Sequence, residues 1–296
     1  MAYAAEVDDS SVVGQWGDPV AHPEVQFGEQ GARLTYGSYL HLDRLLSAQQ
    51  LESRPPAHDE LLFITIHQVY ELWFQQLLHE ATAVRDVMQS SALPGVAPGS
   101  DEGGRGLWWA QHLLARMHVI ERVLVQQVDV LETMTPQDFL AFRQALAPAS
   151  GFQSVQFREL EFLSAAKDAS FVRRFKGLTE AETSRLRRRL DEPSLWDAFL
   201  RVLESRGLPV GDDEEVTASV RRVAHDRSSY ADVWAVAEGL LQHDELAASW
   251  RARHVVMVER MIGAKAGTGG SSGADYLRSR LDLRYYPLLW ELRSVL

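Results

Sequence analysis

The sequence LLFITIHQVYELWFQQLL, residues 61–78, is apolar on nearly every face of a helix drawn through it. A helix of this kind is surrounded by other elements, so we place it at the centre of the fold. We predict that it spans about 58–88, with the acidic residues Asp59 and Glu60 in its first turn. Polar side chains that it carries inward need hydrogen-bond partners, and His67 is the most conspicuous of them.

Outward from this helix, apolar residues at helical spacing predict further helices. Their approximate ranges are 107–133, 155–166, 179–190, 193–205 and 230–262. A short helix begins at Thr135, which caps it ahead of Pro136, and Thr179 forms a capping box with Glu182. The chain contains no alternating strand of useful length and no internal repeat. We therefore predict an all-α fold, a single-domain helical bundle.

Two stretches differ in composition from the predicted helices. Residues 1–33 are largely polar with scattered Gly and Pro, and we interpret them as a flexible N-terminal arm before a helical domain over 34–296. Residues 89–106 contain two Pro, five Gly and three Ser, which is typical of a surface loop. We expect this loop to lie within one domain.

The composition excludes several classes of site and partner. The 296 residues include no cysteine, which rules out disulfides, thiolate metal sites and thiolate-ligated haem. The net charge of −11 argues against nucleic acid or an anionic membrane surface as a partner. No apolar run of about 18 residues is present to span a membrane, and the acidic N-terminus does not resemble a signal peptide. We expect a cytoplasmic protein.

The most informative polar residue near the C-terminus is His254. It shares a face of the predicted 230–262 helix with Trp250, Met257 and Met261, so it is either a core histidine or a ligand that faces a pocket. His243 lies about three turns earlier and is a competing ligand. No His-Glu-x-x-His motif or compact cluster of two histidines and a carboxylate accompanies them.

The glycine-rich loop 267–273 follows this helix and contains four glycines and the hydroxyls of Thr268, Ser271 and Ser272. Glycines allow close backbone approach, and the N–H groups of such a loop can bind an anion. The same composition is also typical of a mobile linker.

Three further side chains have both a structural and a functional interpretation. Arg143 lies between Phe139 and Leu146 on the helical face, which is costly for a buried arginine unless it meets an anion; otherwise it reaches the surface. Tyr36 and Tyr39, one turn apart, either border a core or cover a pocket.

These residues lie in motifs that resemble the tryptophan 2,3-dioxygenase family, in the same order over residues 36–273. The motifs are YGSYL (36–40), HDELLFI (58–64), HQVYELWF (67–74), LETMTP (131–136), FR (142–143), SGFQS (150–154), WRARH (250–254) and GTGGSSG (267–273). The resemblance implies an all-helical homotetramer with one haem b per subunit. The implied reaction adds both atoms of O2 across the indole C2–C3 bond of L-tryptophan and gives N-formylkynurenine.

The resemblance also implies roles for single residues around the haem. His254 corresponds to the proximal ligand of the haem iron, and Gly151 belongs to a turn against the haem. His67 corresponds to the distal histidine that bonds the indole N–H. Arg143 corresponds to the anchor of the substrate carboxylate.

The remaining implied roles concern the pocket around the substrate. Phe63, Phe139 and Leu146 correspond to walls around the indole, and Thr268 to the residue that meets the amino-acid end. Tyr36 and Tyr39 correspond to residues that enter the pocket of a neighbouring subunit.

Two alternative functions would use the same anchor residues or the same haem. Gln75 and Phe139 differ from residues found in many or some members, which leaves open a haem monooxygenase that acts on a substituted tryptophan in secondary metabolism. A haem sensor without catalysis would need no substrate anchors, which makes His67, Arg143 and Thr268 difficult to explain.

Overall fold

The computed structural model describes residues 31–93, 106–270 and 272–296. Every regular element in these ranges is a helix, so the predicted all-α fold is confirmed. Most of the predicted N-terminal arm, most of the predicted 89–106 loop, and Ser271 lie outside the described residues. The chain divides into two compact units, residues 1–48 and 49–296.

The described part of the first unit holds two short helices, α1 (Tyr36–Leu40) and α2 (Leu42–Leu45). Thr35 caps α1 by accepting the Ser38 N–H at 3.1 Å. Tyr36 and Tyr39 are 77% and 70% exposed, so neither borders a core within the described chain.

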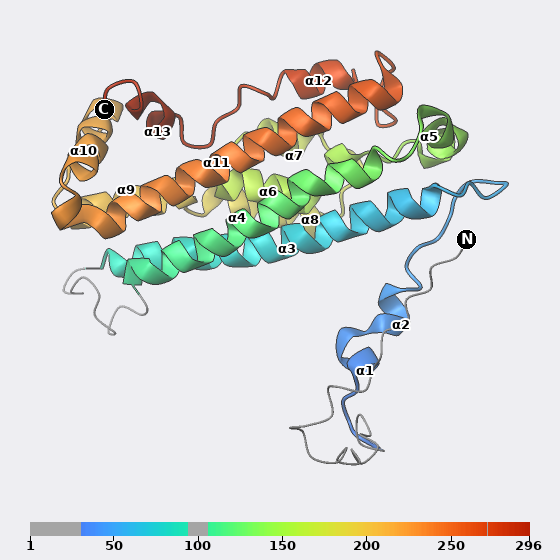
Figure 1. The fold of residues 1–296 in the computed structure, drawn as a ribbon, viewed down its shortest axis with the longest axis horizontal. Helices are drawn as coiled ribbons and strands as arrows, with labels where there is room; N and C mark the ends of the chain where they lie inside the picture. The colour runs from blue at the N-terminus through green and yellow to red at the C-terminus, as the bar shows by residue number, and fades with distance from the viewer. Residues whose placement is uncertain (1–30, 94–105, 271) are drawn as a thin grey trace, which may run out of the picture. The chain divides into compact units, whose positions relative to one another are not determined.

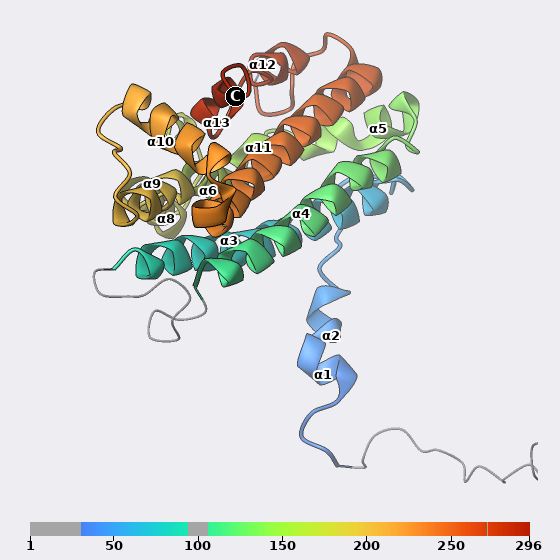
Figure 2. The same ribbon diagram turned by 60° about the vertical axis from the view of Figure 1, so that its left-hand side comes forward.

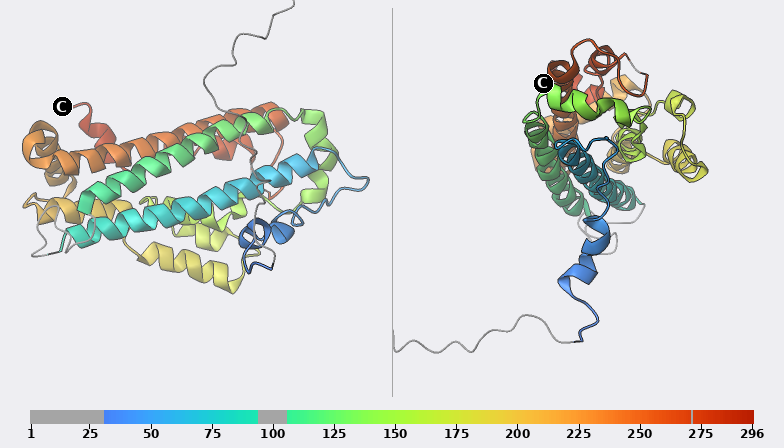
Figure 3. Two further views of the ribbon diagram at one scale, coloured as in Figure 1. Left: turned by 60° about the horizontal axis from the view of Figure 1, so that its bottom comes forward. Right: turned by 90° about the vertical axis from the view of Figure 1, so that its right-hand side faces the viewer.

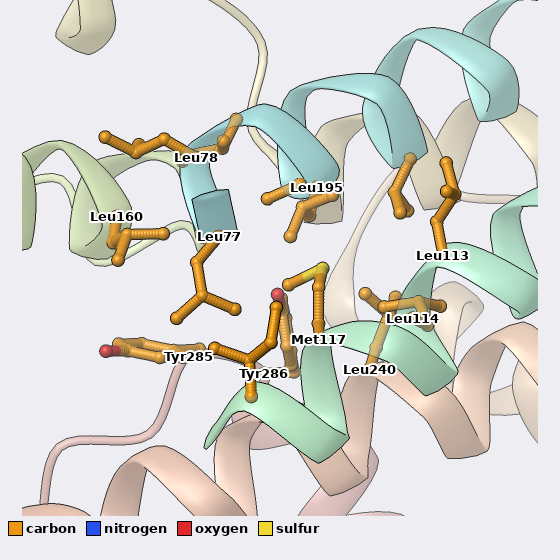
Figure 4. Close-up of a cluster of buried hydrophobic side chains, with 14 of the residues drawn as sticks. Leu77, Leu78, Leu113, Leu114, Met117, Leu160, Leu195, Leu240, Tyr285 and Tyr286 are labelled. Atoms are coloured by element: carbon orange, nitrogen blue, oxygen red, sulfur yellow. The ribbon is translucent and has the colours of Figure 1, made fainter. Parts of the chain in front are cut away.

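The second unit is built on three long helices, α3 (Glu60–Ser91), α4 (Gly106–Leu131) and α11 (Arg227–Ile262), which lie side by side (Figures 1 and 2). Their shared core includes Leu77 of α3, Met117 of α4 and Leu240 of α11, and all three are almost fully buried (Figure 4). This interdigitation of large apolar side chains supplies the main stabilisation of the bundle.

The prediction that the first half of α3 is buried on every face is wrong. Leu61 and Leu72 are each 50% exposed. The described partners of α3 are chiefly α4, α6 (Val155–Leu163) and α9 (Leu195–Ser205), and they leave part of its surface uncovered.

The predicted helices are confirmed with small shifts at their ends. α8 (Glu180–Asp191) begins with the Thr179–Glu182 capping box, and α11 begins three residues before the predicted start, with non-helical φ/ψ angles at Tyr230. The other elements are α5 (Pro136–Arg143), η2 (Gln144–Leu146), η3 (Gly151–Gln153), α7 (Ser170–Arg174), α10 (Asp213–His225), α12 (Ala274–Arg278) and α13 (Pro287–Leu292). None of the helices in the described ranges has both the length and the apolar character needed to cross a membrane.

Helix α5 positions the site. Figure 3 shows α5 across the end of the bundle where α3 begins and where α4 and α11 end. Thr135 caps it by accepting the Asp138 N–H at 3.2 Å, so a local sequence signal sets where this cross-helix starts. Arg143 lies in its last turn and faces inward, with 8% of its surface exposed.

Candidate active site

A cavity of about 300 Å³ lies at this end of the second unit, between α3, α5, α6 and α11. Its size is at the lower end of the range for ligand pockets. It gathers most of the site residues that the sequence predicts: Phe63, His67, Phe139, Arg143, Gly151, His254 and Thr268. Leu146 packs against the core but does not line the cavity, and Tyr36 and Tyr39 belong to the other unit.

His254 lines the cavity from α11. Its ring is stacked on that of Trp250, with centroids 5.1 Å apart and the planes 6° from parallel. Burial, together with repulsion from His67 when that ring is protonated, lowers the pKa of His254 to about 4. The imidazole is therefore neutral at pH 7, which is the form that binds a metal. No residue of the described chain forms a hydrogen bond with it.

His67 has a defined tautomer. Its Nδ1 lies 2.7 Å from the carbonyl oxygen of Phe63, and because a carbonyl only accepts hydrogen bonds, Nδ1 carries the proton. Burial lowers the pKa of His67, which keeps the ring neutral. Its Nε2 is then a hydrogen-bond acceptor on a side chain that lines the cavity.

Arg143 is buried, so the interpretation that it reaches the surface is wrong. Its Nη2 donates a hydrogen bond to the carbonyl oxygen of Ala266 in the loop after α11. A carbonyl does not neutralise a guanidinium, so a carboxylate would be a stronger partner for the same donors.

The glycine-rich loop folds against the segment before η3 rather than forming a linker. Thr268 Oγ1 donates to the Ala149 carbonyl oxygen at 2.7 Å. A Cβ atom on Gly269 would lie 2.5 Å from the Ser150 Cβ, so only glycine allows this approach. Gly267, Thr268 and Gly273 of this loop line the cavity.

The structure separates the two candidate ligands on α11. His243 is 3% exposed and does not line the cavity. Its Nδ1 is bonded to Glu121 Oε1, and its Nε2 lies 2.8 Å from Ser164 Oγ. Burial alone would lower the pKa of His243, but the Glu121 carboxylate outweighs it and the pKa is raised. Both ring nitrogens are used within the protein, which leaves His254 as the ligand candidate.

The sequence reasoning did not identify three arginines and one glutamate that also line the cavity: Arg158, Glu161, Arg251 and Arg280. Arg251 lies one turn before His254, and Arg158 lies one turn after Ser154. Their helical spacing from these motif residues could have identified both arginines as site residues.

Comparison with known proteins indicates the family of this chain. A family model described as tryptophan 2,3-dioxygenase matches residues 21–215 and 215–296. The chain belongs to the tryptophan 2,3-dioxygenase family. A protein of Nocardioides sp. with that name is 71% identical over 272 residues, which cover 92% of this chain and 98% of the relative.

More distant members of the tryptophan 2,3-dioxygenase family match over similar lengths. The relative from Myxococcus xanthus is 42% identical over 89% of this chain and 90% of its own length. The one from Herpetosiphon aurantiacus is 43% identical over 88% of this chain and 98% of its own length. Membership makes the chain an oxidoreductase, and the family resemblance found in the sequence is confirmed.

Tryptophan 2,3-dioxygenases depend in general on haem, and the cavity has the chemistry that this cofactor requires. His254 offers a neutral imidazole without a protein partner, and Phe74, Phe157 and Val258 provide apolar walls. Within the described ranges, no group of three or more His, Asp or Glu could hold a bare metal ion. A single histidine ligand suits an iron whose other ligands come from a porphyrin.

Proposed function

We propose that this chain adds both atoms of O2 across the indole C2–C3 bond of L-tryptophan, with haem b, and gives N-formylkynurenine. The observation that carries the proposal is a neutral, unpartnered His254 in the same cavity as neutral His67 and buried Arg143. Bound haem supplies the oxygen chemistry, and the protein binds, orients and shields the substrate.

His254 would hold the haem iron through one ring nitrogen. Trp250 supports this role because its ring is stacked on the imidazole and restricts its orientation. Gly151 would let the backbone lie against the haem, since it lines the cavity and has free space where a Cβ would be.

His67 would accept a hydrogen bond from the indole N–H through Nε2, because the Phe63 carbonyl already takes the Nδ1 proton. The rings of Phe63 and Phe139 lie 5.6 Å apart and would form an apolar wall for the indole. Together these contacts would orient C2 and C3 and exclude water. Leu146 does not line the cavity, so its place in this wall stays a prediction.

Arg143 would bind the substrate carboxylate in a bidentate pair, exchanging the Ala266 carbonyl for a charged partner. Thr268, two residues after Ala266, would meet the amino-acid end of the substrate. The loop that carries both residues already lines the cavity, so the substrate would bind between α5 and this loop.

We also propose that the chain forms a homotetramer. In it, Tyr36 and Tyr39 would enter the pocket of a neighbouring subunit. Tetramers are typical of the family. The large exposure of both tyrosines supports an intersubunit role, as do apolar residues exposed along α4: Trp108, Val119, Val123 and Val130. The flexible N-terminal arm, the domain over 34–296 and the cytoplasmic location remain predictions.

Product analysis tests the reaction. The haem-loaded, reduced protein is incubated with L-tryptophan in air, and the product is measured by mass spectrometry. We expect two added oxygen atoms. A product with one added oxygen would instead support the monooxygenase, which the names of the relatives do not favour, and a haem spectrum without turnover would support a sensor.

A further inference from the structure

The proposed substrate site does not use three arginines that line the same cavity. Arg158 comes from α6, Arg251 from α11, and Arg280 from the segment after α12. Arg158 and Arg280 both approach Glu161. The Arg251 guanidinium lies 5.1 Å from the centre of the Tyr285 ring, and Tyr285 also interacts electrostatically with Glu161. We call Arg158, Arg251 and Arg280 the arginine cluster.

Arg251 has unused hydrogen-bond donors although it is buried. Only 6% of its surface is exposed. Nη2 donates to the Leu283 carbonyl oxygen at 2.7 Å, but Nε and Nη1 are buried and have no hydrogen-bond partner within the described chain. Buried donors without partners are costly and rare, so these two nitrogens indicate a missing acceptor.

Arg158 and Arg280 are also incompletely bonded. Arg158 is 4% exposed, pairs with Glu161 and stacks on the Phe171 ring at 3.4 Å, yet its Nε has no partner among the described residues. Arg280 approaches Glu161 only to 3.9 Å. One carboxylate therefore serves two guanidinium groups.

The carboxylates around the cluster leave Arg251 without a hydrogen-bonded acid. Glu161, Asp244 and Asp168 all interact with arginines of the cluster, but none of them accepts a hydrogen bond from Arg251. Asp244 Oδ1 is 3.9 Å from Arg251 Nη2, which is beyond hydrogen-bond distance. Its Oδ2 accepts the backbone N–H of Tyr285 at 2.7 Å and the Trp290 Nε1–H at 3.0 Å. The free donors of Arg251 therefore indicate a further acceptor, and an anion is the strongest acceptor for a guanidinium.

The position of Arg251 indicates which anion would bind to it. It lies three residues before His254 on α11, so the two side chains share a face one turn apart. A cofactor held at His254 would lie beside Arg251. Haem b carries two propionate carboxylates, and the geometry of a guanidinium matches a carboxylate. The substrate carboxylate already has a candidate partner in Arg143.

We propose that Arg251, together with Arg280, binds a propionate of haem, and that Arg158 supports this site by holding Glu161. The proposal rests on the proposed haem site. It assigns the charged end of the cofactor to α11 and the segment after α12, so one helix would hold both the iron and a carboxylate of the same haem.

Binding of haem and of its dimethyl ester, which lacks both carboxylates, tests the proposal. Each is titrated into the full-length apoprotein and followed by the Soret band. We expect the wild-type protein to bind the ester at least tenfold more weakly than haem. In Arg251→Met, haem binding falls to nearly the affinity of the ester, and the tenfold preference is lost.

Arg253→Met is the matched control. Arg253 is on the same helix but pairs with Asp129 and Glu132 and does not line the cavity, so its replacement leaves the preference for haem unchanged. Arg251→Lys, which keeps a positive charge, retains part of the preference. If Arg251→Met fails to fold, the wild-type preference and Arg280→Met still decide the question.

The outcomes distinguish the two proposals. Equal affinity of wild-type protein for haem and its ester overturns the propionate site but leaves the haem site in place. A preference that persists in both Arg251→Met and Arg280→Met also overturns it. Failure to bind haem or ester at all overturns the haem-dependent function, and with it this inference.

Discussion

The same helix, α11, carries two histidines that behave in opposite ways. His243 has both ring nitrogens bonded, to Glu121 of α4 and to Ser164 after α6. His254, three turns later, lines a cavity and has no hydrogen-bond partner in the described chain. A buried polar group that the protein satisfies is part of the framework, whereas one left unsatisfied is available to a ligand. Substitutions of these and other polar side chains test this difference.

Replacement of His254 has the largest expected effect. His254→Ala removes the only proposed ligand of the iron, so we expect loss of the Soret band from the purified protein. Far-UV circular dichroism should show that the helices remain, because the side chain has no hydrogen bonds to lose. Normal haem binding by this variant would return His243 to consideration.

Replacement of His243 should affect the framework instead. His243→Leu leaves Glu121 buried without its partner, which we expect to lower the free energy of unfolding by about 3–5 kcal/mol. Urea denaturation measures this loss. At temperatures where the variant is folded, its Soret band should match that of the wild-type protein, and a shifted band would show that the two histidines are not separate in role.

Arg143 is a buried side chain that is only partly satisfied, because its partner is the neutral carbonyl of Ala266. Arg143→Ala should weaken L-tryptophan binding by about 2–5 kcal/mol if the proposed carboxylate pair is buried. Substrate-induced spectral change, titrated in the haem-loaded protein, gives the affinity. An unchanged affinity would mean that the carboxylate binds elsewhere, while Arg253→Ala serves as a control away from the cavity.

His118 of α4 makes a contribution to the stability of the fold that depends on pH. Its Nε2 is 2.9 Å from the Gly239 carbonyl oxygen, and burial lowers its pKa to about 4. Because this pKa is below the unfolded value of 6.5, the neutral ring stabilises the fold above pH 6.5. Up to about 3 kcal/mol is lost as the pH falls from 6.5 to 4.

Urea denaturation at several pH values measures this dependence on the wild-type protein and on His118→Asn, which should lose part of it. The raised pKa of His243 acts in the opposite sense, because it stabilises the fold at low pH and loses that contribution as the pH rises through the folded pKa. An identical slope in both proteins would contradict the contribution assigned to His118.

The smallest expected effect concerns His67. His67→Leu removes one proposed hydrogen bond to the indole N–H and should weaken L-tryptophan binding by about 1 kcal/mol. An analogue methylated on the indole nitrogen should bind the wild-type protein more weakly than L-tryptophan. If the variant discriminates between these two ligands as strongly as the wild-type protein does, His67 does not read the indole N–H.

Local features of the sequence predicted the helices because their signals span only a few residues. Thr135 and Thr179 cap α5 and α8 as predicted. The short helices α7, α12 and α13 were missed, since five or six residues give too little apolar periodicity to detect. The exposure of Leu61 and Leu72 was also missed, because a run of apolar residues does not say how many neighbours surround it.

The sequence alone determined that the protein is all-α, where its main helices lie and, through ordered motifs, which family it belongs to. It could not choose between His243 and His254, which share one helix and one residue type. That choice depended on Glu121, 122 residues before His243 in the chain. The arginine cluster likewise gathers residues from three distant segments. Hydrogen-bond satisfaction and charge balance are properties of such long-range contacts, so only the tertiary structure decided which buried groups have unused donors or lone pairs.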